Sequence, residues 1–127
     1  FGGKTVVKSG GEEGFQDVPT KYSDVNIKIF KGLTNPVKIY QSHCDAVLIA
    51  PPGSINILSN DKCVQYYQYG SIYSVQSHPE ISVSTAIKIA KRDNQNINEI
   101  LNGVNGDNIQ SHIVLHNFIS MVEKRVK

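Results

Sequence analysis

The chain has 127 residues, which is room for one modest domain with a buried core. Its 13 basic and 11 acidic side chains give a formal net charge of +2, and no cluster of Lys and Arg with interleaved aromatic residues indicates a nucleic-acid-binding face. The apolar runs are far shorter than the ~20 residues of a membrane span, no basic-then-apolar leader opens the chain, and two cysteines are too few for a disulfide framework. We therefore expect a cytoplasmic protein that binds neither nucleic acid nor membrane.

Short strands are expected through the first two thirds of the chain. Apolar and β-favouring runs, broken by Gly, Pro, Asn and Asp, predict strands at 4–8, 25–29, 37–41, 46–50, 55–59, 64–69 and 73–78. Residues 12–20 are expected to form a loop, and residues 42–45 a polar break between two strands. The turn at Gly70 joins the last two strands as a hairpin, in which a run of tyrosines is expected to pack rather than to bind a ligand.

The last of these strands ends at His78, which is followed by Pro79 and Glu80. Proline cannot donate to the strand ladder, and side chains at strand ends in α/β sheets project into the crevice where ligands bind. Imidazole readily accepts a proton near neutral pH, and a carboxylate that holds its second nitrogen fixes its tautomer. These residues alone leave two interpretations open: a general base with its orienting carboxylate, or a structural or solvent-exposed histidine.

Helical spacing of apolar residues replaces the strand pattern after this stretch. Ser82 is the expected N-cap of a helix whose last turn carries basic residues. An Asn-rich segment follows at 93–108 and is expected to be a loop around one short helical turn at 97–101.

A final helix is expected at 108–124, with Asp107 or Asn108 as its cap. His112 and His116 are four residues apart on this helix, so their rings share a face, as metal-binding pairs do. No acidic or cysteine ligand is expected near them, and an exposed helix face is the simpler interpretation. We therefore expect no metal and no cofactor.

Three landmarks occur in the order typical of one protein family. They are Phe1-Gly2-Gly3-Lys4, the stretch from Gln41-Ser42-His43-Cys44-Asp45 to Pro51-Pro52-Gly53, and the stretch from Tyr69-Gly70 to Val75-Gln76-Ser77-His78-Pro79-Glu80. In these residues the chain resembles the class I glutamine amidotransferases, and among them the GMP-synthase-like glutaminase domain, over residues 1–90. The resemblance implies an α/β fold: the C-terminal part of a three-layer, flavodoxin-like domain with a mixed sheet. Residues 1–127 are then expected to be a single partial domain.

The resemblance also implies a chemistry and a set of site residues. In this family a cysteine thiolate attacks the side-chain amide of glutamine, ammonia leaves, and water releases glutamate from the thioester. His78 is expected to act as the general base and Glu80 to orient it, while Ser42, His43 and Asp45 form the substrate-binding wall. The expected substrate is glutamine or a γ-glutamyl compound, and the acceptor of the ammonia belongs to a synthetase domain or subunit.

The cysteine of such a triad is not recognisable in this chain. In the family it lies on a Gly-x-Cys-x-Gly turn before the Gly-Gly landmark, so the resemblance implies that the sequence begins downstream of the nucleophile. Cys44 and Cys63 lack the flanking glycines, and both are expected to be buried thiols; a substitute nucleophile is the alternative for each. The chain alone is therefore expected to be inactive. A non-catalytic remnant or a regulatory module with the same fold stays open as the alternative function.

Overall fold

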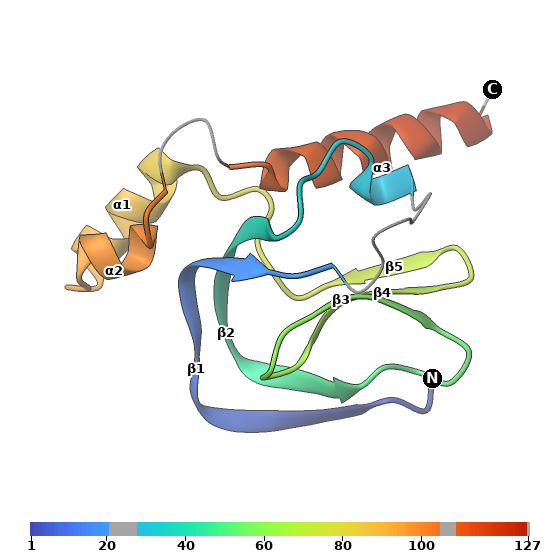
Figure 1. The fold of residues 1–127 in the computed structure, drawn as a ribbon, viewed down its shortest axis with the longest axis horizontal. Helices are drawn as coiled ribbons and strands as arrows, with labels where there is room; N and C mark the ends of the chain where they lie inside the picture. Colours follow the sequence, from blue (N-terminus) through green and yellow to red (C-terminus); the bar gives the residue numbers. More distant parts are fainter. Residues whose placement is uncertain (21–27, 105–108, 127) are drawn as a thin grey trace.

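The computed structural model describes residues 1–20, 28–104 and 109–126. In chain order the elements are β1 (Lys4–Val18), the 3₁₀-helix η1 (Lys28–Phe30), β2 (Val37–Ile49), β3 (Ile55–Ser59), β4 (Val64–Tyr69), β5 (Ile72–Val75), α1 (Val83–Arg92), α2 (Ile97–Leu101) and α3 (Ser111–Val126). Figure 1 shows the strands curving around one another, with α1 and α2 grouped at one end and α3 beside η1. The expected α/β class, with strands first and helices last, is confirmed.

The five strands form one sheet in the order β1-β2-β4-β3, and β5 pairs with β4. Every strand pair among the described residues is antiparallel, so the parallel pairs of the expected mixed sheet are not found there. The physical reason is connectivity, because no described α-helix lies between two strands to carry a parallel crossover. The β4–β5 hairpin turns at Gly70, as the sequence predicts.

Two predictions of local structure are wrong in the same region. Residues 12–18 belong to β1 instead of a loop, and residues 42–45 continue β2 instead of interrupting it. The two polar stretches pair with each other, since Glu12 lies opposite His43 and Glu13 lies opposite Ser42. Tertiary pairing thus overrides the weak strand tendency of each polar segment. A register shift between Val7 and Glu12 interrupts this ladder.

The helices follow the sequence prediction closely. The Ser82 side chain caps α1 by accepting a hydrogen bond from the Thr85 amide at 3.2 Å, and α2 occupies the predicted turn at 97–101. Helix α3 begins at Ser111, and the caps predicted for it at 107 and 108 lie outside the described residues. Of the strand predicted at 25–29, only the last two residues are described, and they belong to η1.

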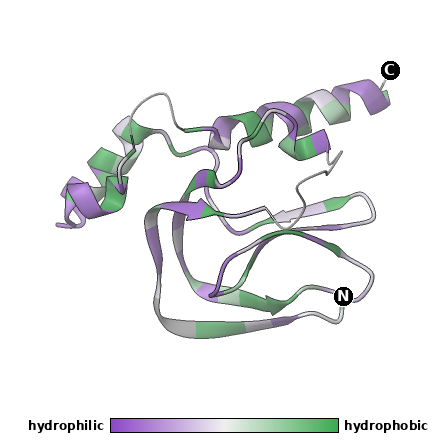
Figure 2. Ribbon diagram, viewed as in Figure 1, coloured by the Kyte–Doolittle hydropathy of each residue, from purple (hydrophilic) through white to green (hydrophobic). Residues whose placement is uncertain are grey.

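Two apolar clusters lie on opposite faces of the β1–β2 ladder. Ile39 joins a cluster that includes Ile29 of η1 and Val114 of α3, whereas the adjacent Tyr40 packs with Phe15 against α1 and α2. Neighbouring residues of a strand point to opposite faces, so helices cover both sides of this ladder. Figure 2 shows hydrophobic and hydrophilic residues interspersed along α1 and α3, as amphipathic helices on a sheet require.

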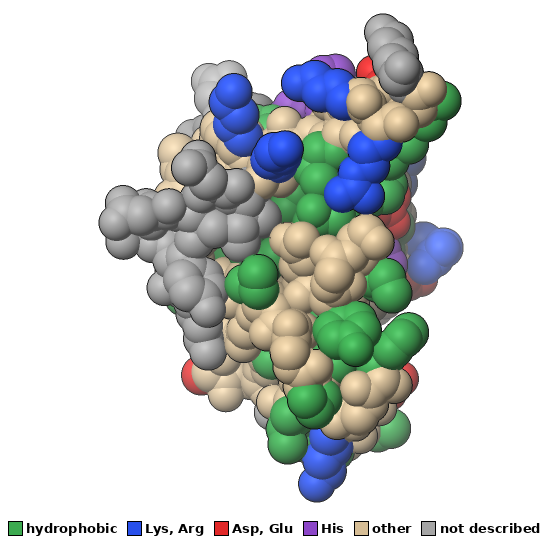
Figure 3. Space-filling view, turned by 90° about the vertical axis from the view of Figure 1, so that its right-hand side faces the viewer, with side chains coloured by type: hydrophobic (Ala, Val, Ile, Leu, Met, Phe, Trp, Pro, Cys, Tyr) green, Lys and Arg blue, Asp and Glu red, His purple; other side chains and the backbone are tan. Residues whose placement is uncertain are grey.

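Apolar side chains also remain on the surface of the described residues. The large ones include Phe1, Val7, Ile49, Ile55, Ile119 and Val126, each exposed over 46% or more of its surface. Figure 3 shows hydrophobic side chains gathered on one face, below a group of Lys and Arg side chains. An apolar surface of this kind is suited to packing against further protein.

Gly14 provides a test of how β1 meets α2. Its φ is +82°, and a Cβ at this position would lie 2.7 Å from the backbone oxygen of Ile100. We expect Gly14→Ala to lower the free energy of unfolding by about 1–2 kcal/mol because of the strain of a left-handed residue. The overlap with the Ile100 backbone should lower it by roughly 1–3 kcal/mol more. Gly32→Ala is the matched control, because Gly32 has φ +86° but no atom within 4 Å of the added Cβ. Urea unfolding measures the free energy of unfolding of both variants. Equal decreases in the two variants would contradict the close contact of Gly14 with α2.

Tyr66 gives a pH-dependent test of the core. Burial raises its pKa from 10.0 to about 12, and the Ser77 hydroxyl bonded to its phenol opposes part of that rise. The buried neutral phenol therefore stabilises the fold fully below pH 10, and this contribution is lost as the pH rises toward 12. We expect the wild-type chain to lose more unfolding free energy than Tyr66→Phe between about pH 9 and about pH 11. Parallel loss in both chains would show that this phenol is not the group that titrates.

Candidate functional site

His78 is held at the junction of the sheet and α1. Its backbone amide donates to the carbonyl of Tyr40 on β2 at 2.9 Å, and its own carbonyl accepts from the Ile81 amide at 3.1 Å. The preceding Ser77 is buried, and its hydroxyl bonds to the Tyr66 phenol within the core. These contacts fix the backbone on both sides of the imidazole, which is 41% exposed.

The His78 ring is paired with Glu80. The distance between His78 Nδ1 and Glu80 Oε1 is 2.9 Å, and the Glu80 side chain is 57% exposed. An ionised carboxylate can only accept, so the proton of a neutral ring lies on Nδ1 and Nε2 carries a lone pair. This arrangement presents a proton acceptor on the side of the ring away from Glu80.

A pocket of about 250 Å³ lies beside the His78 ring. Ser42 and Tyr40 of β2 and Glu13 of β1 form one wall, and residues from the end of α1 and the turn after it form the other: Ile89, Arg92, Asp93 and Gln95. Glu80 faces a neighbouring cavity of about 310 Å³, which it lines with His112. The ring of His78 therefore belongs to the first pocket and its carboxylate partner to the second.

Charged and hydrogen-bonding groups converge on the first pocket. Tyr40 donates to one carboxylate oxygen of Glu13 at 3.3 Å, and Ser42 donates to the other at 3.1 Å. Burial, followed by the charge of Glu13, raises the pKa of Tyr40 to about 12, so its phenol stays neutral and donates at neutral pH. Across the pocket Arg92 forms two hydrogen bonds of 2.6 and 2.7 Å to Asp93, which raise the pKa of the guanidinium and lower that of the carboxyl.

The five expected site residues are placed differently. His78 and Ser42 line this pocket, and Glu80 is bonded to the His78 ring, whereas neither His43 nor Asp45 lines the pocket. The His43 ring donates from Nδ1 to the Asp45 carbonyl at 2.8 Å and turns toward β1. Strand alternation explains the difference, because consecutive residues of β2 face opposite sides of the sheet.

Several pocket residues were missed by sequence reasoning. Glu13, Tyr40, Arg92 and Asp93 carry no motif, and only the pairing of Glu13 with Ser42 and the packing of α1 place them here. The β1–β2 register could have identified Glu13, but a single sequence does not specify that register.

Neither cysteine and neither helix histidine lines this pocket. Cys63 is buried as predicted, but the prediction of a buried thiol is wrong for Cys44, which is exposed on β2. His112 and His116 are both exposed on α3. Among residues 1–20, 28–104 and 109–126, no helix is long and apolar enough to cross a membrane.

Comparisons with known proteins show what this chain is similar to. No family model matches it. The glutamine-hydrolyzing GMP synthase subunit of Thermococcus kodakarensis is 35% identical over 85 residues, which cover 65% of this chain and 44% of the relative. The subunit of the same name from Pyrococcus furiosus is 32% identical over 91 residues, covering 65% of this chain and 48% of the relative. The chain thus spans about half the length of the curated relatives it matches.

Solved structures show the same fold. A glutamine amidotransferase of Thermotoga maritima superposes with a TM-score of 0.67 at 18% identity, covering 99% of this chain and 56% of the other. A glutamine amidotransferase of Methylobacillus flagellatus gives a TM-score of 0.68 at 17% identity, covering 94% of this chain and 56% of the other. In sequence and in fold, this chain is therefore class I glutamine-amidotransferase-like, and it corresponds to about half of such a chain.

Proposed function

We propose that the complete protein hydrolyses the side-chain amide of glutamine, or of a related γ-glutamyl compound, with His78 as general base and Glu80 as its orienter. The observation that carries the proposal is the 2.9 Å bond between His78 Nδ1 and Glu80, with the same ring lining a pocket beside Ser42. The curated relatives, named as glutamine-hydrolysing, support the choice of substrate.

The proposed reaction uses both nitrogens of the His78 ring. Nε2 accepts the proton of a cysteine thiol as the sulfur attacks the amide carbon, and the resulting imidazolium gives that proton to the departing ammonia. Nε2 then takes a proton from the water that attacks the thioester, and the thiol recovers it as glutamate leaves. Glu80 holds Nδ1 throughout and stabilises the imidazolium.

The wall formed by β2 is assigned to the substrate. Ser42 contacts it directly, because its side chain lines the pocket. His43 and Asp45 are bonded to each other on the same strand and shape this wall through the backbone. Arg92 lies at the opposite wall, where it is bonded to Asp93. Its guanidinium can bind a substrate carboxylate if it releases the Asp93 carboxylate.

The rest of the site is assigned to protein beyond residues 1–127. We propose that these residues form a single partial domain, whose exposed apolar surface packs against the segment that carries the nucleophile. The ammonia acceptor then belongs to a synthetase domain or subunit.

A non-catalytic module with the amidotransferase fold is the second candidate. The observation in its favour is that neither Cys44 nor Cys63 is among the residues that line the His78 pocket. A thiol from outside residues 1–127 is needed for the first candidate and not for the second.

The first test uses the longest natural coding sequence that contains these residues. If the protein it encodes carries a Gly-x-Cys-x-Gly turn upstream of Phe1, we expect it to release glutamate from glutamine, and His78→Ala to lower kcat/KM by about 10²–10⁴-fold or more. Glu80→Gln should lower kcat/KM less than His78→Ala does, because it leaves the imidazole ring present and weakens only the contact that orients it. His116→Ala is the matched control and should leave the rate unchanged, since that ring is exposed on α3. Full activity in a folded His78→Ala variant would contradict the proposal.

A second test measures glutamate release by the 127-residue chain alone. It should release no more glutamate than its Cys44→Ser and Cys63→Ser variants. Turnover by this chain that disappears in Cys44→Ser would instead make Cys44 the nucleophile.

A further inference from the structure

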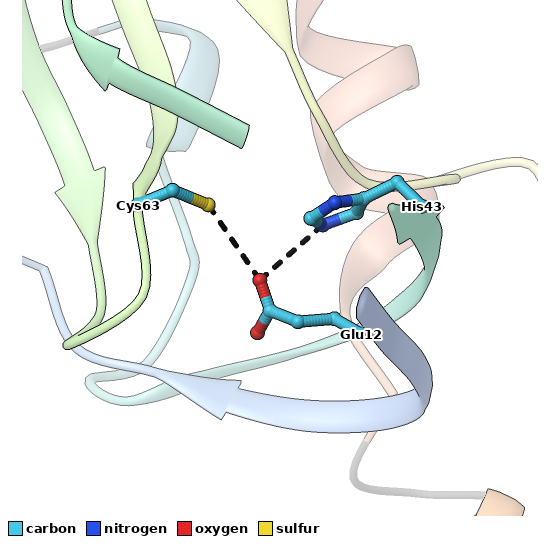
Figure 4. A group of neighbouring side chains, drawn as sticks. All are labelled: Glu12, His43 and Cys63. Carbon is cyan, nitrogen blue, oxygen red and sulfur yellow. Dashed lines mark hydrogen bonds and ion pairs between the residues drawn. The ribbon is translucent and has the colours of Figure 1, made fainter. Parts of the chain in front are cut away.

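Three side chains with metal-binding atoms converge on the face of the β1–β2 ladder opposite the His78 pocket. They are Glu12 of β1, His43 of β2 and Cys63, the residue before β4, and Figure 4 shows all three pointing toward one another. Their ligand atoms lie within 4.8 Å of one another. The site is enclosed, because the side chains of Glu12 and His43 are only 2% and 11% exposed and Cys63 is 6% exposed.

The orientation of His43 leaves a lone pair directed at a carboxylate. Nδ1 is 2.8 Å from the Asp45 carbonyl oxygen, which can only accept, so Nδ1 carries a proton. Nε2 is 3.3 Å from Glu12 Oε2, yet it is buried without a hydrogen bond. When the ring is neutral and Glu12 is ionised, two acceptors therefore face each other, and either a proton or a metal ion between them relieves the repulsion.

The two separations measured from Glu12 match the edges of a tetrahedral zinc site. Zinc bonds of about 2.0 Å to oxygen and nitrogen and about 2.3 Å to sulfur place neighbouring ligands about 3.3 Å apart for O and N and about 3.5 Å for O and S. The observed separations are 3.3 Å between Glu12 and His43 and 3.6 Å between Glu12 and Cys63. A mixed thiolate, imidazole and carboxylate set is a donor combination that zinc accepts.

Each of the three side chains also contacts a polar group outside the set. Asn60 donates to Glu12 Oε1 at 2.6 Å, the amide of Gln65 donates to Glu12 Oε2 at 2.6 Å and lies 3.3 Å from Cys63 Sγ, and the Asp45 carbonyl holds His43. Supporting contacts of this kind orient the ligands of metal sites and stabilise their metal-binding forms.

A second catalytic triad does not fit the same residues. In a triad the carboxylate holds one ring nitrogen and the other faces the nucleophile, whereas Glu12 lies between His43 and Cys63 and contacts both. The site is also too enclosed to admit a substrate.

We propose that Glu12, His43 and Cys63 bind one Zn²⁺ ion as a structural site. The side-chain oxygen of Gln76 lies 4.0 Å from Cys63 Sγ and is a candidate ligand for the fourth position. The ion joins β1, β2 and the start of β4 where pairing is weakest, because β2 and β4 share only the register pair Val47–Val64. The site stands independently of the proposed glutamine chemistry.

The experiment titrates the metal-free protein with Zn²⁺ against a chromophoric chelator, with folding of each variant checked by circular dichroism. We expect one Zn²⁺ per chain in the wild type, and at least about tenfold weaker binding in Cys63→Ser and His43→Gln. Cys44→Ser is the matched control and should bind Zn²⁺ as the wild type does, since Cys44 is exposed on β2 beside His43. Zn²⁺ should raise the Tm of the wild type and of Cys44→Ser, but not of Cys63→Ser.

A second measurement needs no variant. Co²⁺ added to the wild-type protein should give the thiolate-to-metal charge-transfer band and the visible bands of a tetrahedral site. Absence of the charge-transfer band, absence of Zn²⁺ binding, undiminished binding in Cys63→Ser or loss of binding in Cys44→Ser would each overturn the proposal.

Discussion

The long antiparallel pairing of β1 with β2 is the constraint on which both candidate sites depend. Because side chains alternate across a strand, one register places Glu13 beside Ser42 on one face and Glu12 opposite His43 on the other. The first face meets α1 and forms the His78 pocket, and the second meets the start of β4 and forms the buried cluster. A shift of one residue would exchange the two faces and dismantle both sites.

Two histidines are used in the same way on these two faces. His78 is held through Nδ1 by Glu80, and His43 through Nδ1 by the Asp45 carbonyl. Each ring therefore presents Nε2 to its site, His78 in a partly exposed pocket and His43 within the core. The difference in solvent access suits the two proposed roles: a base must exchange protons with a substrate, whereas a metal ligand must keep its ion.

Local chemistry determines which parts of this structure the sequence could predict. The Ser82 cap, the short helix at 97–101 and the hairpin at Gly70 depend on neighbouring residues and were predicted correctly. The pairing of His78 with Glu80 spans two residues and could be anticipated for the same reason. Continuity of β2 through 42–45, the Glu13 wall and the Glu12 cluster depend on the register of distant strands, which no local pattern encodes.

The tautomers of His78 and His43 are the most direct test, because both sites require a proton on Nδ1 and a lone pair on Nε2. Long-range ¹H–¹⁵N correlation spectra of the histidine-labelled, metal-free protein, recorded at a pH where the rings are neutral, distinguish the two nitrogens of each ring. We expect the Nδ1–H tautomer for both residues, with His78→Ala and His43→Gln used to assign the signals. An Nε2–H tautomer at His78 would contradict its role as a base held by Glu80, and the same result at His43 would remove the lone pair that the metal site requires.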